Sequence, residues 1–365
     1  MKADTFNEEA LIETQPVPGE KRKSRRARDE KTAETETALL HAYFPNVHDE
    51  SLLEKLNDLL DSYENHSEVV EKLGLSRVGR LNEGRAVAVV GSSGLGKSRS
   101  LERAFQGLGM SELESNVRII SLKAPSPCNL KQLGIAILKA LKFEIQGDIR
   151  ENVIWQLVRE QLKLRGIRFL HIDELQHLTQ LDSPYEATKV CDTFKGLMQD
   201  NEWPVWLVLS GMPNLASVIE RDVQLRRRCT FVRLERMSSN ADDLKTVQRI
   251  VKNYCKKAGL SDENLPMLDL CSRLLHGSDG RFGCLIEIVQ EALFKAMRAR
   301  RKHSLIGDFE LAYEDRTGCR PEHNVFAEEV EWQNVDVRNT LYPDEAEFAG
   351  TRKPTKRRRK TSRRA

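Results

Sequence analysis

The segment that most constrains the fold is GSSGLGKS, residues 91–98, which follows the apolar run Ala86–Val90 and precedes a helical pattern. It fits the pattern G-x-x-x-x-G-K-[ST], in which glycines let backbone N–H groups turn inward around phosphate groups. In this pattern Lys97 reaches the β- and γ-phosphate oxygens, the Ser98 hydroxyl binds Mg²⁺, and the start of the helix favours the anion. A strand, a glycine-rich turn and a helix in this order therefore predict a site for ATP and Mg²⁺.

The predicted nucleotide-binding residues belong to this turn and to the first helical positions after it. A bare match to the pattern can arise by chance, and the strand before it and the helix after it are what favour nucleotide binding. The residues are Gly91, Ser92, Ser93, Gly94, Leu95, Gly96, Lys97, Ser98 and Arg99.

A pair of acidic residues follows another apolar run, in the segment RFLHIDELQHL. Asp173 comes at the carboxyl end of a predicted strand, beside the phosphate-binding turn, and is predicted to hold Mg²⁺ through water. Glu174 is predicted to polarise the attacking water as the catalytic carboxylate. His171 and His177 flank the pair, but their spacing is not that of a metal site, so we interpret them as packing or surface residues.

Further apolar runs predict the strands of a sheet. They lie at 86–90, 117–122, 167–172, 204–209 and 230–234, and helical stretches separate most of them. Near-continuous apolar strands that alternate with helices are typical of a parallel sheet covered on both faces. Ser210 ends the fourth of these runs, where its small hydroxyl is predicted to sense the γ-phosphate or to orient the water.

The sequence outside these strands divides into a helical part and two basic segments. From residue 242 to about 305 only helical patterns occur, including RFGCLIEIVQEALFKAM, and they predict a second, all-helical domain. Residues 21–28 hold six basic residues in eight, and residues 352–364 hold nine Lys or Arg and no acidic residue. Such segments are typical of disordered arms, and nucleic-acid contact and simple solubility are equally good interpretations of them.

We expect four regions along the chain: a disordered basic N-terminal arm (1–38), an ATPase core (39–236), a helical lid (237–310) and a polar C-terminal extension with a basic tail (311–365). No apolar run approaches the roughly 18 residues that cross a bilayer, and the start MKADTFNEEALIE lacks the order of a signal peptide. We therefore expect a cytoplasmic protein without a membrane partner. The seven cysteines form no C-x-x-C pair, which argues against a disulfide framework or a zinc site.

Three consecutive arginines, Arg226, Arg227 and Arg228, stand directly before the last predicted strand. A strand-terminal arginine in a P-loop ATPase with a helical second domain resembles the arginine finger of the AAA+ superfamily, which reaches the γ-phosphate of a neighbouring subunit. Arg281, in GSDGRFG, resembles the second sensor arginine of that superfamily, which links the nucleotide state to the position of the lid. The resemblance implies an α/β fold: a P-loop AAA+ core, with a five-stranded parallel sheet and helices on both faces, and then a small all-helical lid domain.

Three motifs narrow this resemblance. HIDELQHL, LVLSGMPNL and DVQLRRR, in this order and spacing, look like the motifs of bacterial transposition ATPases of the TniB/TnsC type. Matching the last motif residue by residue selects Arg228 as the finger, although Cys229 stands where an aromatic residue is usual. The family implies assembly with ATP into a ring or helical filament on duplex DNA. Its further implied partners are a transposase and a target-selection protein.

Two other functions remain open from the sequence. A replication initiator or loader ATPase normally adds a DNA-reading helical domain after the lid, whereas the residues beyond 305 are polar and low in helical periodicity. A signalling or scaffold protein would use the nucleotide as a switch and never touch DNA. Lys123 lies where a DNA-facing loop is expected, although a lone lysine there is more often merely solvated.

Overall fold

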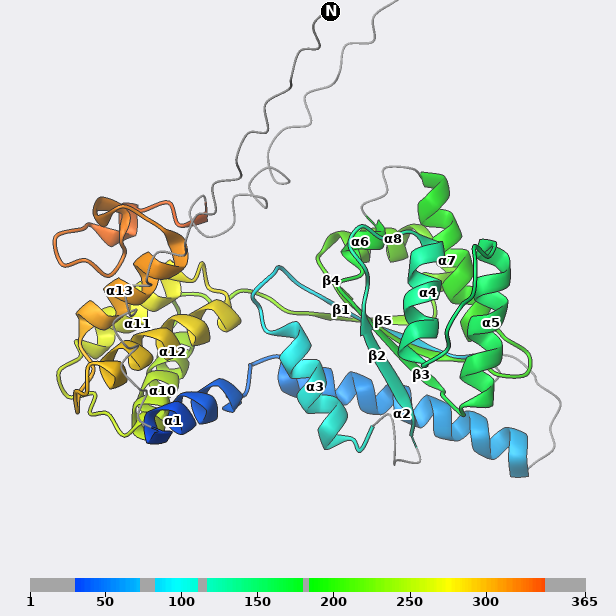
Figure 1. Ribbon diagram of the computed structural model, residues 1–365, viewed down its shortest axis with the longest axis horizontal. Coiled ribbons are helices and arrows are strands. Elements are labelled where there is room, and N and C mark those ends of the chain that lie inside the picture. Colours follow the sequence, from blue (N-terminus) through cyan, green and yellow to red (C-terminus); the bar gives the residue numbers. More distant parts are fainter. Residues whose placement is uncertain (1–29, 73–82, 111–116, 180–183, 339–365) are drawn as a thin grey trace, which may run out of the picture.

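The computed structural model describes residues 30–72, 83–110, 117–179 and 184–338 (Figure 1). Its centre is a parallel sheet with the strand order β2-β3-β4-β1-β5, which confirms the predicted fold class. Each strand overlaps one of the predicted apolar runs. The strands are β1 (Ala86–Val90), β2 (Ile119–Lys123), β3 (Phe169–Asp173), β4 (Trp206–Gly211) and β5 (Cys229–Arg233).

Helices cover both faces of the sheet (Figure 1). Side chains alternate between the two faces along each strand, so the apolar residues of a strand need helices on both sides to bury them. In β1, Val87 and Val89 pack toward α2 (Asp49–Lys72) and α3 (Lys97–Gly107). The other three residues of β1 pack toward the opposite layer, and the whole strand is buried. That layer consists of α4 (Leu130–Ala140), α5 (Glu151–Leu164), α7 (Pro184–Met198), α8 (Asn214–Arg221) and α9 (Val223–Arg226).

The strand order brings three distant segments of the chain to one edge of the sheet. β4 lies between β1 and β3, so the carboxyl ends of these strands are neighbours. The P-loop follows β1, Asp173 ends β3, and Ser210 is the next-to-last residue of β4. In open α/β sheets ligands bind outside this carboxyl edge. The topology therefore brings the P-loop, Asp173 and Ser210 together.

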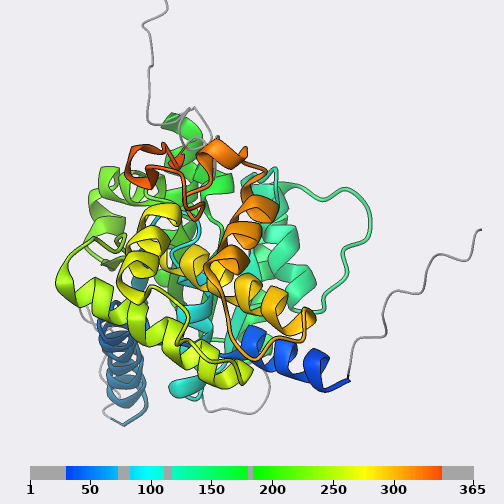
Figure 2. The same cartoon turned by 90° about the vertical axis from the view of Figure 1, so that its left-hand side faces the viewer.

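An all-helical domain lies beside the sheet (Figure 1 and Figure 2). Its helices bury their apolar stripes against one another around residues such as Leu293. Local chemistry sets the ends of α10 (Ala241–Ala258): the Asn240 side chain accepts hydrogen bonds from two backbone N–H groups of the first turn, and Gly259 adopts the left-handed conformation that ends the helix. The helices are α10 (Ala241–Ala258), α11 (Met267–Gly277), α12 (Phe282–Arg298) and α13 (Ile306–Thr317).

The first described helix, α1 (Glu30–His41), differs from the expected disordered arm over residues 1–38. Leu39 is fully buried in the core of the helical domain, and Glu36 pairs with Arg298 of α12, with Nε 2.8 Å from the carboxylate. Helix α1 therefore belongs to the helical domain, although it precedes the sheet in the sequence. EKTAETETALLH has few apolar residues, so its periodicity gave no helical signal.

The expected boundary at residue 310 falls inside α13, and the chain after this helix folds back onto the helical domain. Residues 318–338 contain the short turns η2 (Pro321–His323) and η3 (Trp332–Asn334). Phe326 is buried, and Arg273 of α11 donates to the carbonyl oxygens of Val325 and Ala327 at 2.8 and 2.9 Å. This segment is therefore part of the helical domain and not a detached polar extension.

Three other expectations concern the chain as a whole. The seven cysteines are free thiols, and six of them are buried. Across the described ranges, no helix has both the length and the apolar character needed to cross a membrane. The two basic segments, 21–28 and 352–364, lie outside the described residues.

Candidate nucleotide-binding and hydrolysis site

The phosphate-binding turn connects β1 to α3 and encloses the side chain of Lys97. Gly94 and Gly96 have φ angles of 77° and 91°, a left-handed conformation that glycine adopts without strain. The Lys97 Nζ donates to the carbonyl oxygens of Gly91 at 2.7 Å and Ser92 at 2.9 Å, and the residue is buried. The turn thus holds a buried cation at the amino end of a helix, an arrangement that binds phosphate.

Asp173 lies buried beside this turn. Its Oδ2 accepts a hydrogen bond from Ser98 Oγ at 2.6 Å, and its Oδ1 accepts from Ser210 Oγ at 2.5 Å and from the Glu174 N–H at 2.9 Å. Burial raises the pKa of Asp173, but the hydrogen bonds from Ser210 and Ser98 outweigh it and hold the pKa below its ordinary value. The carboxylate is therefore ionised near neutral pH. Together with the Ser98 hydroxyl it offers the hard oxygen ligands that Mg²⁺ prefers.

Glu174 lines the cavity next to Lys97. Its φ angle of 56° is unusual for a residue with a side chain, and its carboxylate accepts a hydrogen bond from the Gln176 side-chain amide. The Gln176 Oε1 in turn accepts from the backbone N–H of Met212 at 3.2 Å, and Gln176 is buried. Gln176, in α6 (Gln176–Thr179), therefore ties the predicted catalytic carboxylate to the loop after β4. Sequence reasoning missed this role; a polar amide two residues after an acidic pair was the available signal.

The structure shows His171 as a buried packing residue and adds polar partners that the sequence did not indicate. Residues two apart in a strand share a face, so the side chains of His171 and Asp173 lie on the same side of β3. His171 is buried, its Nε2 lies 3.0 Å from Ser210 Oγ, and its Nδ1 lies 2.6 Å from Ser121 Oγ. Burial lowers the pKa of His171 to about 4. His177, by contrast, is only partly buried and makes no part of this chain of contacts.

A cavity opens between the P-loop and the helical domain. One side carries the phosphate-binding groups, and the other carries aromatic and aliphatic side chains, as the phosphates and the flat base of a nucleotide require. Of the predicted nucleotide-binding residues, Gly91, Ser92 and Leu95 belong to the turn but do not line the cavity. The first side consists of Ser93, Gly94, Gly96, Lys97, Ser98, Arg99 and Glu174. The second includes Ala42, Tyr43, Phe44, Tyr254, Phe282, Ile286 and Gln290.

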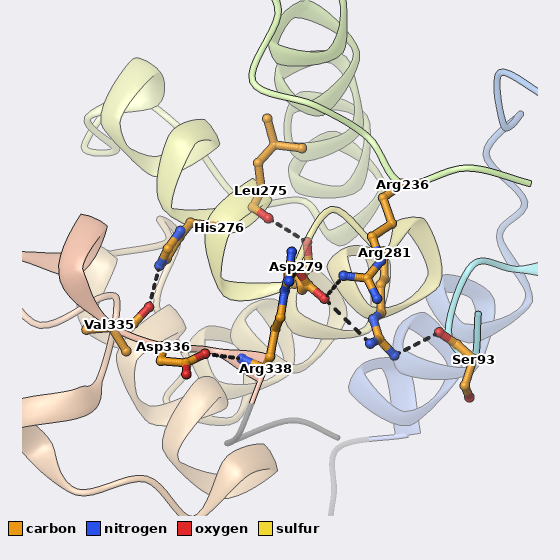
Figure 3. A network of polar contacts seen from close by, with 10 residues as sticks. Ser93, Arg236, Leu275, His276, Asp279, Arg281, Val335, Asp336 and Arg338 are labelled. Atoms are coloured by element: carbon orange, nitrogen blue, oxygen red, sulfur yellow. Dashed lines mark hydrogen bonds and ion pairs between the residues drawn. The ribbon is translucent and has the colours of Figure 1, made fainter. Parts of the chain in front are cut away.

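Arg281, the predicted second sensor, stands directly before α12 and is buried (Figure 3). Its guanidinium donates to the P-loop carbonyl of Ser93 at 3.2 Å. The start of α12 strengthens this junction, because the N–H of Gly283 donates to the carbonyl of Gly94 at 2.7 Å. A Cβ at Gly283 would come within 2.6 Å of that same oxygen, so the close approach requires glycine. Arg281 therefore joins the helical domain to the P-loop, although it does not line the cavity.

Three arginines converge on the carboxylate of Asp279 (Figure 3). Arg236 follows β5, Arg281 contacts the P-loop, and Arg338 lies in the C-terminal segment, with Nε 3.3 Å from Asp279. The Asp279 carboxylate thus links three parts of the molecule: the segment after β5, the arginine that contacts the P-loop, and the last described residue. Aspartate is common in turns, so its presence in GSDG gave no signal of this role.

The three arginines before β5 lie at the amino end of that strand, whereas the P-loop follows the carboxyl end of β1 in the same parallel sheet. Arg228 Nε donates to the Glu83 carboxylate at 2.5 Å, and its Nη1 donates to the carbonyl of Gln224 at 2.7 Å. Arg226 and Arg227 are exposed. The length of the sheet therefore separates all three guanidinium groups from their own P-loop, and Arg228 is ordered by a partner within its own chain.

Comparison with known proteins agrees with this architecture. The model of a family described as bacterial TniB protein matches residues 51–239. Among solved structures the chain is similar to Cdc6p from Pyrobaculum aerophilum, with a TM-score of 0.55 and 15% identity, over 77% of this chain and 70% of that one. It is also similar to the Aeropyrum pernix ORC1 protein in complex with DNA, with a TM-score of 0.52 and 17% identity, over 77% and 69% of the two chains. No curated protein matches.

The structural similarities are at low identity and show the fold alone, which is a P-loop core joined to a helical domain. The family match spans more than half of the chain, and it includes the P-loop, Asp173, Glu174, Ser210 and Arg228. The buried lysine of the P-loop, the ionised aspartate and the neighbouring glutamate are the groups that ATP hydrolysis by such a domain requires. The chain is therefore a P-loop AAA+ ATPase, and it belongs to the bacterial TniB family.

Proposed function

We propose that ATP-bound copies of this protein assemble on duplex DNA, as a ring or helical filament, and recruit or regulate a transposase at its target site. The observation that carries this proposal is the position of Arg228, at the amino end of β5. An arginine there cannot contact phosphates bound at the carboxyl edge of its own sheet. It acts on ATP only when a second copy presents its P-loop at this edge, so a finger role requires assembly.

The proposal requires the Arg228 guanidinium to exchange one bound anion for another. Within one chain the Arg228 guanidinium is paired with the Glu83 carboxylate, and Glu83 keeps about a third of its side chain exposed. The γ-phosphate of a neighbouring subunit would replace that carboxylate. Arg228 would then stabilise the negative charge that develops on the transferred phosphate.

Each subunit would hold ATP and Mg²⁺ with residues that are already close together. Lys97 and the N–H groups of the turn would bind the β- and γ-phosphates, Ser98 would supply an oxygen ligand for Mg²⁺, and Asp173 would hold the ion through water. The described residues contain no group of three or more His, Cys, Asp or Glu that could hold a metal by itself. Phosphate oxygens and water would complete the coordination of Mg²⁺. Glu174 would polarise the attacking water, and Ser210 would sense the γ-phosphate or orient the water.

The proposed DNA contact rests on charge and on the family. Residues 352–364 carry nine basic side chains, which can neutralise DNA phosphates. The Aeropyrum pernix ORC1 protein, which has a similar fold, was solved in complex with DNA. We propose the same class of partner for this chain.

Filter binding to duplex DNA with ATP, with ADP and without nucleotide tests the proposal. We expect tight binding with ATP only, little sequence preference, and an affinity that falls steeply as salt rises, because phosphate contacts release counterions. Replacing the nine Lys and Arg of the tail by Gln keeps its length and should flatten this salt dependence. Equal binding in all three nucleotide states would contradict assembly that depends on ATP. No binding in any state would contradict the DNA contact and favour a scaffold that does not use DNA.

A further inference from the structure

A chain of polar side chains crosses three strands of the sheet and ends at Asp173. Ser121 on β2 lies 2.6 Å from His171 on β3, His171 lies 3.0 Å from Ser210 on β4, and Ser210 reaches Asp173 at 2.5 Å. The exposed fractions of His171, Ser210 and Asp173 are 4%, 0% and 3%. Solvent therefore has no access to replace a contact that is lost in this inner part of the chain.

The chemistry of the groups gives the direction of the inner hydrogen bonds. An ionised carboxylate only accepts, so the Ser210 hydroxyl donates its single proton to Asp173. The Ser210 oxygen then has only lone pairs left for His171, and the Nε2 of His171 must carry a proton and donate. This direction holds whichever state the Nδ1 nitrogen has.

The ring of His171 is held in this orientation from two further sides. The Phe105 ring of α3 meets it edge to face, with centroids 5.2 Å apart, and Ser121 contacts its Nδ1. A rotation of the ring would lose the contacts with Ser121 and Ser210 together. Helix α3 also begins at Lys97, so one helix both carries the phosphate-binding lysine and packs against the imidazole.

We propose that His171 is a positioning residue for ATP hydrolysis and that it acts through Ser210. By donating to the Ser210 oxygen, His171 occupies a lone pair of this hydroxyl. The hydroxyl proton therefore points away from the ring, toward the nucleotide site. The acceptor there is Asp173. Donation to a hydroxyl also strengthens the bond that the hydroxyl itself donates.

Two matched variants separate the two nitrogen atoms of the ring. In His171→Gln the side-chain NH₂ extends to the region of Nε2 and can still donate to Ser210, whereas in His171→Asn it reaches only the region of Nδ1. We expect ATP hydrolysis by the full chain to fall about tenfold or more in His171→Asn and to stay within about threefold of wild type in His171→Gln. ATP affinity should change less than about threefold in both. Equal losses of hydrolysis in the two variants would overturn the proposal.

The control is His177→Asn, at a histidine that is partly exposed. This variant should hydrolyse ATP at the wild-type rate. A double variant then tests whether His171 acts through Ser210. We expect His171→Asn to add less than about a twofold loss to that of Ser210→Ala, because residues that act as a unit are not additive. Losses that multiply would show that His171 acts independently of Ser210, and would overturn the proposal.

Nitrogen NMR of the ¹⁵N-histidine-labelled full chain, without nucleotide, tests the hydrogen-bond direction without any measurement of activity. The signals of His171 are those missing from His171→Gln. A protonated Nε2 at neutral pH supports the proposal. An unprotonated Nε2 would mean that Ser210 donates to the ring and not to Asp173, and the proposal would fail.

Discussion

The two edges of the sheet hold their charged side chains in different ways. At the carboxyl edge, Lys97 and Asp173 are buried and each is surrounded by hydrogen-bond partners from the P-loop, Ser98 or Ser210. At the amino end of β5, Arg226 and Arg227 are exposed, and Arg228 has a partner that itself touches solvent. The first edge is thus organised within one chain, whereas the second keeps its cations available to another molecule.

Magnitudes explain this difference. Leaving a buried acceptor without its hydrogen-bond partners costs about 1–3 kcal/mol, and more when the acceptor is charged, because no water replaces them. An ion pair that keeps contact with water contributes about 0–1 kcal/mol. Arg228 can therefore exchange Glu83 for another anion at small cost, while Asp173 can leave its two serine partners only when a cation replaces them.

The largest expected effect tests the buried edge. In Lys97→Ala the phosphates lose a buried cation, and we expect ATP affinity to fall by about 100-fold or more. Fluorescent-nucleotide titration measures this loss. Lys123→Ala, at an exposed lysine of β2, is the control and should bind ATP like wild type. Unchanged affinity in Lys97→Ala would mean that the P-loop is not the nucleotide site.

The next effect separates binding from hydrolysis at the same edge. Glu174→Gln keeps the shape of the side chain but cannot polarise water, so we expect hydrolysis to fall about 100-fold or more while ATP affinity changes less than about threefold. Steady-state turnover and nucleotide titration measure the two quantities. Glu160→Gln, on the exposed side of α5, should match wild type. Equal turnover in Glu174→Gln and wild type would remove Glu174 from the chemistry.

Arg228→Ala tests whether the exposed edge acts on a neighbouring subunit. We expect this variant to bind ATP normally, to assemble poorly and to hydrolyse ATP about tenfold or more slowly. Mixing it with Lys97→Ala gives some interfaces with an intact P-loop from one chain and Arg228 from the other. Turnover of the mixture should therefore exceed that of either variant alone.

Arg226→Ala and Arg227→Ala are the matched controls, because both side chains are exposed and close to Arg228 in the sequence. They should hydrolyse ATP nearly like wild type. A mixture without recovery, in which co-assembly is demonstrated, would show that Arg228 does not act across a subunit boundary. Loss of hydrolysis in Arg227→Ala alone would move the finger to Arg227.

The smallest effect concerns the partner of Arg228. Glu83→Gln removes the carboxylate that holds the guanidinium in the isolated chain, and the hydrogen bond from Arg228 lowers the pKa of Glu83, so the group is ionised at neutral pH. We expect turnover of the assembled protein to change less than about threefold, with stability lowered by about 1 kcal/mol or less. Urea unfolding and turnover measure both. A loss of turnover as large as that of Arg228→Ala would mean that Glu83 orders the finger for catalysis.

Much of the sheet and of the P-loop follows from local sequence patterns. Apolar runs predicted the five strands. The inner strands β1, β3 and β4 are buried along their whole length, which requires apolar residues on both faces. The glycines and Lys97 predicted the phosphate site, because the turn needs left-handed φ angles and a cation at fixed positions. Helix α1 and residues 318–338 were not predicted, because their few apolar residues become a core only when the helical domain covers them.

The sequence by itself determined which chemistry this protein carries: a phosphate-binding turn, an acidic pair, and arginines before the last strand. Only the tertiary structure decided which side chains, distant in the sequence, contact these groups. His171 meets Ser210, Arg281 meets Ser93, and Arg228 meets Glu83 across 39, 188 and 145 positions of the chain. Strand order and register set such contacts, and both result from the packing of the whole core, so no local pattern encodes them.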